Sequence, residues 1–130
     1  MARLRAFPRH GGPSVKRVLL TGASGFIGRH CVSSLQERGY EVHAVHYRHQ
    51  SPGDPRVVWH NADLLDPAAL SCLFSGVSPT HLLHLAWYAA PGDYITSSEN
   101  LRWVDASMEM LRRFREEGGR RVVVAGSCFE

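Results

Sequence analysis

Cysteine is scarce in this sequence of 130 residues. The three that occur, Cys31, Cys72 and Cys128, are scattered and show none of the paired spacings of zinc ligands. This scarcity argues against a disulfide scaffold and a structural zinc site, and it fits a reducing, cytoplasmic compartment. Long apolar runs are also missing, since no stretch approaches the ~20 residues that span a bilayer. We therefore expect no membrane partner.

The chain also lacks a large net charge of either sign. The formal net charge is +3, with 44% hydrophobic and 21% charged residues, a composition typical of a globular domain. Arginines gather near the start of the chain and around the last predicted helix, where they complement the helix dipole, so we expect no nucleic-acid partner. Residues 1–14 are expected to form a flexible N-terminal extension, and residues 15–130 a single domain.

The most informative stretch runs from Val18 to Gly28, where an apolar run breaks into three glycines spaced three apart. The apolar run is typical of a strand buried on both faces of a parallel sheet. Gly22 permits a tight turn, Gly25 lets the backbone approach a pyrophosphate, and Gly28 lets a helix pack on the strand. The N–H groups at the start of that helix then face the phosphates. The stretch therefore predicts a dinucleotide-binding turn.

The residues after the turn supply the context that this motif requires. Ile27, Cys31 and Leu35 recur four residues apart, which predicts a helix. Gly39 is placed where a glycine commonly ends a helix. Residues 41–46 then predict a second strand.

Three histidines along this strand suggest a metal site, because His43, His46 and His49 follow one another at intervals of three. Residues three apart on a strand face opposite sides, so we expect no metal there. The end of the second strand is where a dinucleotide fold meets the adenosine ribose. Arg48 stands there, and it is either a partner for a 2′-phosphate or a solvated loop residue. The expected cofactor is NAD or NADP, and Arg48 favours NADP.

The middle of the chain predicts a third strand over residues 56–60 and a short helix after it. Asp66 is expected to cap this helix and Pro67 to open it, with Phe74 near its end and Gly76 beyond. Asp63 follows the third strand on the edge where ligands bind. Its carboxylate is either an adenine contact or a loop residue.

The fourth predicted strand covers residues 81–86 and ends in Ala86, whose small side chain leaves room for a cofactor. His84 within it is interpreted as a buried, hydrogen-bonded core group in preference to a catalytic one. The loop over residues 87–93 is rich in aromatic and small residues. Such a loop is suited to line a substrate pocket.

A long helix is predicted from Ser97 or Ser98 to Gly118–Gly119. Asn100 near its start is expected to bond a neighbouring loop carbonyl, in a structural or a functional role. Its apolar side chains are interpreted as core packing. Leu101, Val104, Met108 and Leu111 share one stripe with Arg115, and Trp103, Ala106, Met110 and Phe114 broaden it.

The fifth predicted strand, residues 121–125, is continuously apolar after its first residue and should be buried on both faces. Ser127 follows it on the ligand edge, where its hydroxyl could donate to a substrate oxygen. Cys128 is interpreted as a buried thiol, because no histidine is placed to activate it. Together the elements predict an α/β fold, a doubly wound, Rossmann-like parallel sheet in the strand order 3-2-1-4-5, truncated after the fifth strand.

These motifs, taken in order, resemble the extended short-chain dehydrogenase/reductase family, and more narrowly its NAD-dependent nucleotide-sugar epimerases and dehydratases. The octet from Thr21 to Gly28 is similar to that family's cofactor turn, and Asp63-Leu64 to its adenine-contacting pair. His84-Leu85-Ala86 is similar to its fourth-strand signature, although Trp87 stands where alanine is usual. The expected cofactor-binding residues are Gly22, Ser24, Gly25, Phe26, Ile27, Gly28, Arg48, Asp63, Leu64, Leu85, Ala86 and Asn100.

The resemblance also implies a catalytic set, of which Ser127 is the one member found here. The family's Tyr-x-x-x-Lys pair has no counterpart, because Lys16 is the chain's only lysine. We therefore expect the cofactor-binding part of an NAD(P)-dependent epimerase, dehydratase or ketoreductase, with a nucleotide-sugar substrate if the chain continues. The alternatives are a non-catalytic dinucleotide-binding module and a truncated product without activity. A sheet that stops at the fifth strand would expose its apolar flank and invite self-association.

Overall fold

The computed structural model describes residues 15–48 and 54–127. The predicted extension over residues 1–14, His49, part of the loop at 51–55, and Cys128 lie outside the described residues. The helices and strands are β1 (Lys16–Thr21), α1 (Gly28–Glu37), β2 (Tyr40–His46), β3 (Val58–Asn61), α2 (Pro67–Val77), β4 (His81–His84), α3 (Glu99–Glu116) and β5 (Arg121–Val124).

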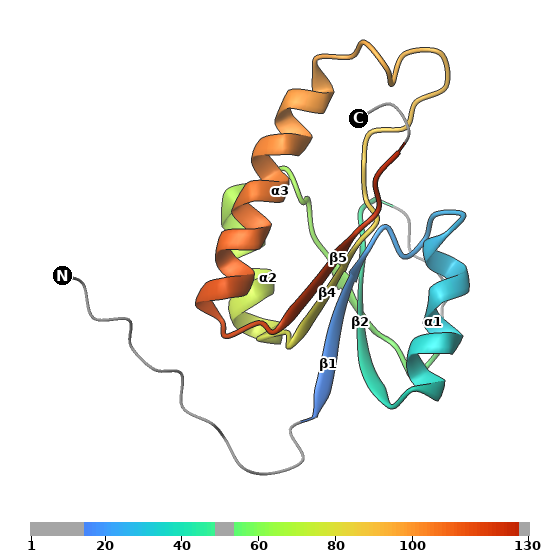
Figure 1. Cartoon of the computed structure of the whole chain (residues 1–130), viewed down its shortest axis with the longest axis vertical. Helices are drawn as coiled ribbons and strands as arrows, with labels where there is room; N and C mark the ends of the chain where they lie inside the picture. Colours follow the sequence, from blue (N-terminus) through green and yellow to red (C-terminus); the bar gives the residue numbers. More distant parts are fainter. Residues whose placement is uncertain (1–14, 49–53, 128–130) are drawn as a thin grey trace, which may run out of the picture.

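The strands of the described chain form one sheet in the order β3-β2-β1-β4-β5, and every neighbouring pair is parallel. This confirms the predicted strand order and the Rossmann-like α/β fold. Helix α1 covers one face of the sheet, and α2 and α3 cover the other (Figure 1). The order reverses between β1 and β4, which creates a crevice at their carboxyl ends.

Apolar side chains of β1 fill the core on both faces of the sheet. Leu19 packs with the side chains beneath α2 and α3, including Phe74 and Met110. Val18 and Leu20 point to the opposite face, beneath α1. All of these residues are at most 2% exposed, as expected for a central strand of a parallel sheet.

Several local predictions about helix ends are confirmed. The side chain of Asp66 accepts a hydrogen bond from the Ala68 N–H at 2.9 Å, and Pro67 opens α2. Gly39 follows the end of α1 with φ +77°, the left-handed conformation that favours glycine. The predicted end of α2 is wrong, because the helix runs through Gly76 to Val77. An added Cβ on Gly76 would meet nothing within 4 Å, so this glycine is an ordinary helix residue.

The prediction for the core face of α3 is wrong in part. The buried residues are Ala106, Met110 and Phe114, whereas Leu101 is 71% and Met108 62% exposed. A helix lying on a sheet buries one face only, and the sheet selects the face that carries Phe114. The other predicted stripe faces away from the core.

Burial of the fifth strand on both faces was also predicted wrongly. In the described chain β5 lies at the edge of the sheet, and Val123 and Val124 are 53% and 51% exposed. Strand β4 ends at His84, two residues before the predicted end at Ala86, although the Leu85 N–H still donates to the Thr21 carbonyl at 3.2 Å. Among the described residues, no helix combines the length and apolar character required to cross a membrane.

Candidate functional site

The turn after β1 begins at Gly22, whose φ of +70° reverses the chain. The Gly25 N–H donates to the Gly22 carbonyl at 3.0 Å and closes the turn. A Cβ on Gly28 would collide with that same carbonyl oxygen, so α1 can start here only with a glycine. Ile27 at the N-cap has an apolar side chain and makes no capping bond. The start of α1 is therefore suited to receive an anion.

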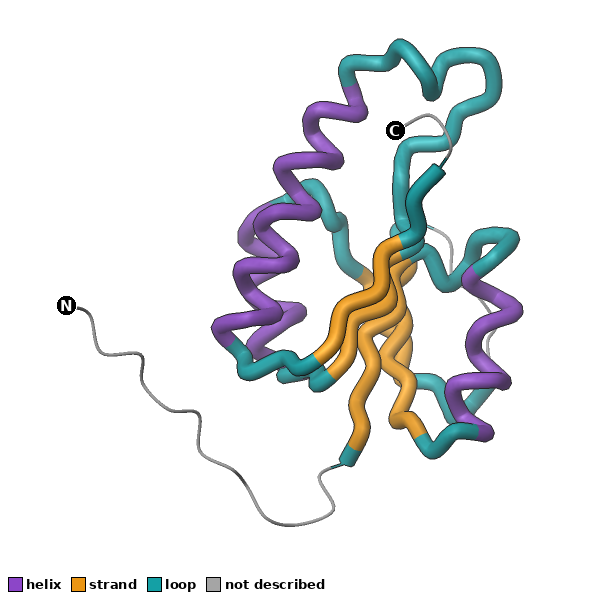
Figure 2. Tube along the Cα trace, in the orientation of Figure 1, coloured by secondary structure: helices purple, strands orange, loops and turns teal. Residues whose placement is uncertain are grey.

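Two turns approach each other at the reversal of the strand order. A Cβ on Gly22 would lie 2.8 Å from the backbone nitrogen of Ala86 and 2.8 Å from the carbonyl carbon of Leu85. The turn after β1 and the turn after β4 are thus in contact through their backbones. Figure 2 shows these loops, with the long loop that precedes α3, gathered beyond the carboxyl ends of the strands.

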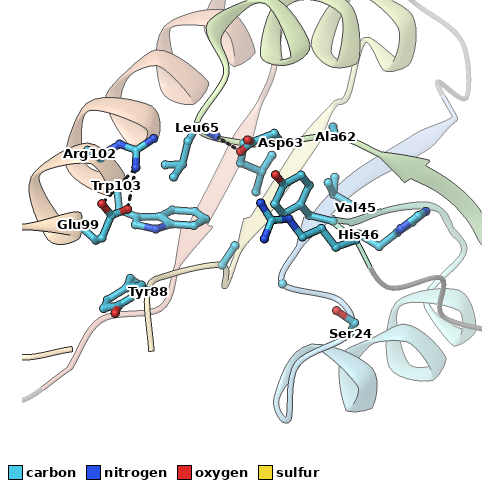
Figure 3. Close-up of a pocket in the computed structure, with 15 residues that line it drawn as sticks. Ser24, Val45, His46, Ala62, Asp63, Leu65, Tyr88, Glu99, Arg102 and Trp103 are labelled. Carbon is cyan, nitrogen blue, oxygen red and sulfur yellow. Dashed lines mark hydrogen bonds and ion pairs between the residues drawn. The ribbon is translucent and has the colours of Figure 1, made fainter. Parts of the chain in front are cut away.

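A cleft of about 530 Å³ opens at this edge. Among the predicted site residues, those that line it are Gly22, Ser24, Arg48, Asp63, Leu64 and Ala86. In Figure 3, Ser24 lies on one side of the cleft, Trp103 and Tyr88 lie on the other, and Asp63 lies between them. These residues are far apart in the sequence, and the sheet brings them together.

Asp63 is half-buried in the cleft wall, directly after β3. Its Oδ1 accepts a hydrogen bond from the Leu65 N–H at 2.9 Å, which fixes the direction of the carboxylate. Within the described chain no hydrogen bond is found for Oδ2. A carboxylate oriented in this way can accept a hydrogen bond from an amino group of a ligand.

Arg48 stands at the mouth of the cleft, after the end of β2. Its guanidinium lies over the ring of Tyr47 with Cζ 4.8 Å from the ring centroid. Its φ of +65° is unusual for a residue with a side chain. Both side chains are exposed and line the cleft, so the guanidinium is accessible to an anion there.

The far wall of the cleft comes from α3 and the loop before it. Arg102 and Glu99 form an ion pair at 2.9 Å, and Trp103 lies beside them. The Tyr88 hydroxyl donates to Asp93 at 3.0 Å. This hydrogen bond is the largest cause that raises the pKa of Tyr88 above its usual value, and loss of hydration is the next. Tyr88 is therefore protonated at neutral pH and is no general base.

Asn100 lies outside the set of residues that line the cleft. Its Oδ1 accepts from the indole N–H of Trp87 at 2.9 Å, and its Nδ2 donates to the Tyr94 carbonyl at 2.6 Å. Asn100 therefore pins the loop before α3, and the bond to a loop carbonyl is the one expected from the sequence. Its contact with a cofactor stays a prediction.

Other predicted site residues lie near the cleft but not in its lining. Gly25, Gly28 and Leu85 belong to the two turns, while Phe26 and Ile27 are 76% and 60% exposed on the outer side of the first turn. Ser127 is exposed after β5, at the ligand edge of the sheet. Its catalytic role stays a prediction.

His84 is confirmed as a buried core group, with 3% of its surface exposed and hydrogen bonds to Thr21 and Ser107. His43 points to the α2 and α3 face and contacts His60, whereas His46 contacts Trp59. In residues 15–48 and 54–127, no group of three or more metal-ligating side chains is close enough to share an ion.

Sequence reasoning did not identify several residues that line the cleft, among them Tyr47, Leu65, Glu99, Arg102 and Trp103. Tyr47 had a usable signal, because it adjoins Arg48. The sequence carries no signal for the residues of α3, because the way the whole helix packs decides which of its turns reaches the cleft.

Comparison with known proteins identifies relatives of the same architecture. The model of the NAD dependent epimerase/dehydratase family matches residues 18–130. The UDP-glucose 4-epimerase of Schizosaccharomyces pombe is 34% identical over 89 residues, which cover 60% of this chain and 25% of that protein. The decarboxylating sterol-4-alpha-carboxylate 3-dehydrogenase of Mus musculus is 31% identical, with 87% of this chain and 30% of that protein covered.

Among solved structures, the UDP-glucose 4-epimerase of Thermus thermophilus, in complex with NAD, aligns with a TM-score of 0.72 and 27% identity. The alignment covers 82% of this chain and 36% of that one. The matched part of this chain thus spans between 25% and 36% of the length of these relatives. The match of the family model over residues 18–130 shows that the chain belongs to the NAD dependent epimerase/dehydratase family.

Proposed function

We propose that these 130 residues are the cofactor-binding part of an NAD(P)-dependent epimerase, dehydratase or ketoreductase that acts on a nucleotide sugar. The observation that carries this proposal is the cleft where the strand order reverses, which the glycine turn, Asp63 and Ala86 border together. Membership of the family supports a nicotinamide dinucleotide as the ligand.

The cofactor is proposed to lie across the cleft from β2 towards β4. The pyrophosphate takes the glycine turn, because the backbone at Gly25 is open and the start of α1 attracts an anion. The adenine amino group donates to Asp63, beside Leu64. The nicotinamide end extends towards Ala86 and, beyond it, the β5 edge that carries Ser127. When bound, the nicotinamide supplies the hydride chemistry of such enzymes.

NADP is proposed as the preferred form of the cofactor. Arg48 lies at the end of β2, where the adenosine ribose is expected, and its planar guanidinium can pair with a 2′-phosphate through two hydrogen bonds. Stacking on Tyr47 holds the guanidinium at the mouth of the cleft. The described lining at this position holds no carboxylate from β2 that would receive a 2′-hydroxyl.

Turnover is not proposed for these residues by themselves. Tyr88 and Tyr94 are not followed four residues later by lysine, and Tyr88 is committed to Asp93. Ser127 is proposed to orient the substrate oxygen in the whole protein. Proton transfer then needs groups that this sequence does not contain.

Self-association through the edge of the sheet is a further part of the proposal. Val123 and Val124 each expose more than half of their surface along β5, and no strand of the described chain pairs with the outer side of β5. The occupant that such an edge accepts most directly is the β5 strand of a second copy.

Titration of the 130-residue chain with NADPH and with NADH by calorimetry tests the cofactor proposal. We expect one binding site and a lower Kd for NADPH. UDP-glucose titrated alone is the control for binding of a nucleotide with no nicotinamide. A chain that is folded by circular dichroism yet binds neither dinucleotide would refute the proposal.

A further inference from the structure

A buried chain of hydrogen bonds runs behind the cleft and joins β1, β4 and α3. Thr21 Oγ1 lies 2.6 Å from His84 Nδ1, and His84 Nε2 lies 3.0 Å from Ser107 Oγ. The Ser107 hydroxyl donates in turn to the Trp103 carbonyl at 2.7 Å. Thr21 is fully buried and His84 is 3% exposed, so water does not compete for the bond between these two side chains.

The direction of each bond in this chain follows from the number of donors. The Thr21 hydroxyl oxygen accepts from the backbone N–H groups of Leu85 and Ala86, at 3.2 Å and 3.3 Å. The Leu85 N–H is shared with the Thr21 carbonyl oxygen, also at 3.2 Å, so the hydroxyl matters most for Ala86. A hydroxyl has two acceptor positions and one hydrogen, so its hydrogen is left to donate to His84 Nδ1. His84 is then neutral, with its proton on Nε2, and it donates to Ser107. Each member of the chain is satisfied by this one arrangement.

The backbone that Thr21 holds is the part that forms the cleft. Ala86 lines the cleft, and its backbone nitrogen would lie 2.8 Å from a Cβ added to Gly22. Within residues 15–48 and 54–127, no backbone bond of the sheet holds the Ala86 N–H, because β4 ends at His84. The Thr21 hydroxyl therefore fixes the Ala86 backbone beside the glycine turn, and the orientation of that hydroxyl depends on His84.

We propose that His84 is a positioning residue for the dinucleotide: by accepting the Thr21 hydroxyl, its ring keeps the turn after β4 seated against Gly22 and so sets the width of the cleft. This inference rests on the proposed function, since it concerns the same cleft. His84 itself touches no ligand, because it lies behind the turn. The bond to Ser107 leads to the Trp103 carbonyl within α3, on the far wall of the cleft, and does not reach the turn after β4.

Paired substitutions separate positioning from a merely structural role. Thr21→Val and His84→Gln remove the bond between Thr21 and His84, because the glutamine amide follows Nε2 of histidine. Thr21→Ser and His84→Asn are the conservative counterparts, which keep the hydroxyl and an acceptor near the Nδ1 position. Ser107→Ala removes the hydroxyl at the α3 end of this series of hydrogen bonds.

The measurements are the Kd for NADPH by fluorescence titration and Tm by circular dichroism, on the whole chain. Thr21→Val loses three hydrogen bonds of the hydroxyl, Ser107→Ala loses two and His84→Gln loses one. All three should therefore lower Tm, and Ser107→Ala should lower it at least as much as His84→Gln does. Only Thr21→Val and His84→Gln should raise Kd by about tenfold or more, the effect of about 1.4 kcal/mol. Thr21→Ser and His84→Asn should stay within about threefold of the parent chain. A Kd that follows Tm across all five variants would overturn the inference.

Amide hydrogen exchange of Ala86 in the unliganded chain distinguishes the two proposals, because the Leu85 amide keeps its bond to the Thr21 carbonyl in every variant. Exchange at the Ala86 amide should be faster in Thr21→Val and His84→Gln than in Ser107→Ala. If exchange responds in this way but the parent chain binds no dinucleotide, the proposed function fails and the control of the turn by His84 stands. If binding is present and exchange is equal in all variants, the positioning role fails and the proposed function stands.

Discussion

Gly25→Val separates the binding of a dinucleotide from the stability of the fold. An added Cβ at Gly25 has one near neighbour, the Gly22 carbonyl oxygen at 3.2 Å, and φ at this position is not in the left-handed region. The turn therefore needs to shift by a few tenths of an ångström to accept the side chain. Gly28→Ala differs, because its Cβ would collide with backbone atoms of Gly22 and Ala23.

The effect of Gly25→Val on stability should be small. Mild overpacking should lower the free energy of unfolding by about 1 kcal/mol, whereas the reduced entropy of the unfolded chain should raise it by about 0.4–1 kcal/mol. The two nearly cancel, so Tm should move by less than about 5 °C. Gly28→Ala should lower Tm by more than Gly25→Val does, since the start of α1 must move away from the turn.

The effect of Gly25→Val on binding should be large. The valine methyl groups occupy the open side of the turn, where a phosphate oxygen must approach backbone N–H groups to about 2.9 Å. Loss of two charge-assisted hydrogen bonds, each worth about 1.5–3 kcal/mol, predicts a rise in Kd of roughly 100-fold or more. The assay is calorimetric titration with NADPH, next to a thermal melt of the same sample.

A matched control is Gly76→Ala in α2, far in sequence from the turn, where an added Cβ meets nothing within 4 Å. Alanine inside a helix should raise the free energy of unfolding by up to about 1 kcal/mol and leave Kd unchanged. Undiminished NADPH binding by Gly25→Val would refute the placement of the pyrophosphate on this turn.

Three further predictions concern charge, pH and assembly. Arg48→Ala should raise the Kd for NADPH about tenfold and that for NADH little, because the lost ion pair involves the 2′-phosphate alone; equal effects in the two titrations would remove Arg48 from the ribose site. Burial, as the largest cause, lowers the pKa of His60, His81 and His84 below 6.5. The unfolded chain therefore binds more protons below pH ~6.5, and the urea midpoint should fall between pH ~7.5 and pH ~5.5; a midpoint that does not fall contradicts this. Val123→Lys should lower the mean mass of the concentrated chain in sedimentation equilibrium, and a parent chain that stays monomeric at all concentrations would contradict association through β5.

Local rules were sufficient for the parts of the fold that local chemistry determines. The apolar run of β1, the glycine turn and α1 follow one another in a pattern that few structures other than a βαβ unit satisfy. The side chain of Asp66 caps α2 as its residue type indicates. His84 was predicted as a buried group because it interrupts an apolar strand, and it is one.

Local rules failed where packing decides between two similar faces. The residues Leu101, Val104, Met108 and Leu111 repeat with the spacing of a packed seam, yet the seam that is buried carries Met110 and Phe114. Both stripes are apolar, so the sequence of α3 alone cannot rank them. For the same reason the sequence does not indicate that Trp103 approaches the cleft, because this depends on how α3 packs on the sheet.

The most direct test of the account is a titration of the ¹⁵N-labelled chain with NADP⁺, followed by two-dimensional NMR. If the dinucleotide lies across the cleft, the largest amide shifts should fall on the two turns and after β3, at Ser24, Asp63 and Ala86. Shifts that concentrate instead on the opposite end of the sheet, around His81 and Arg121, or no shifts at saturating NADP⁺, would contradict it.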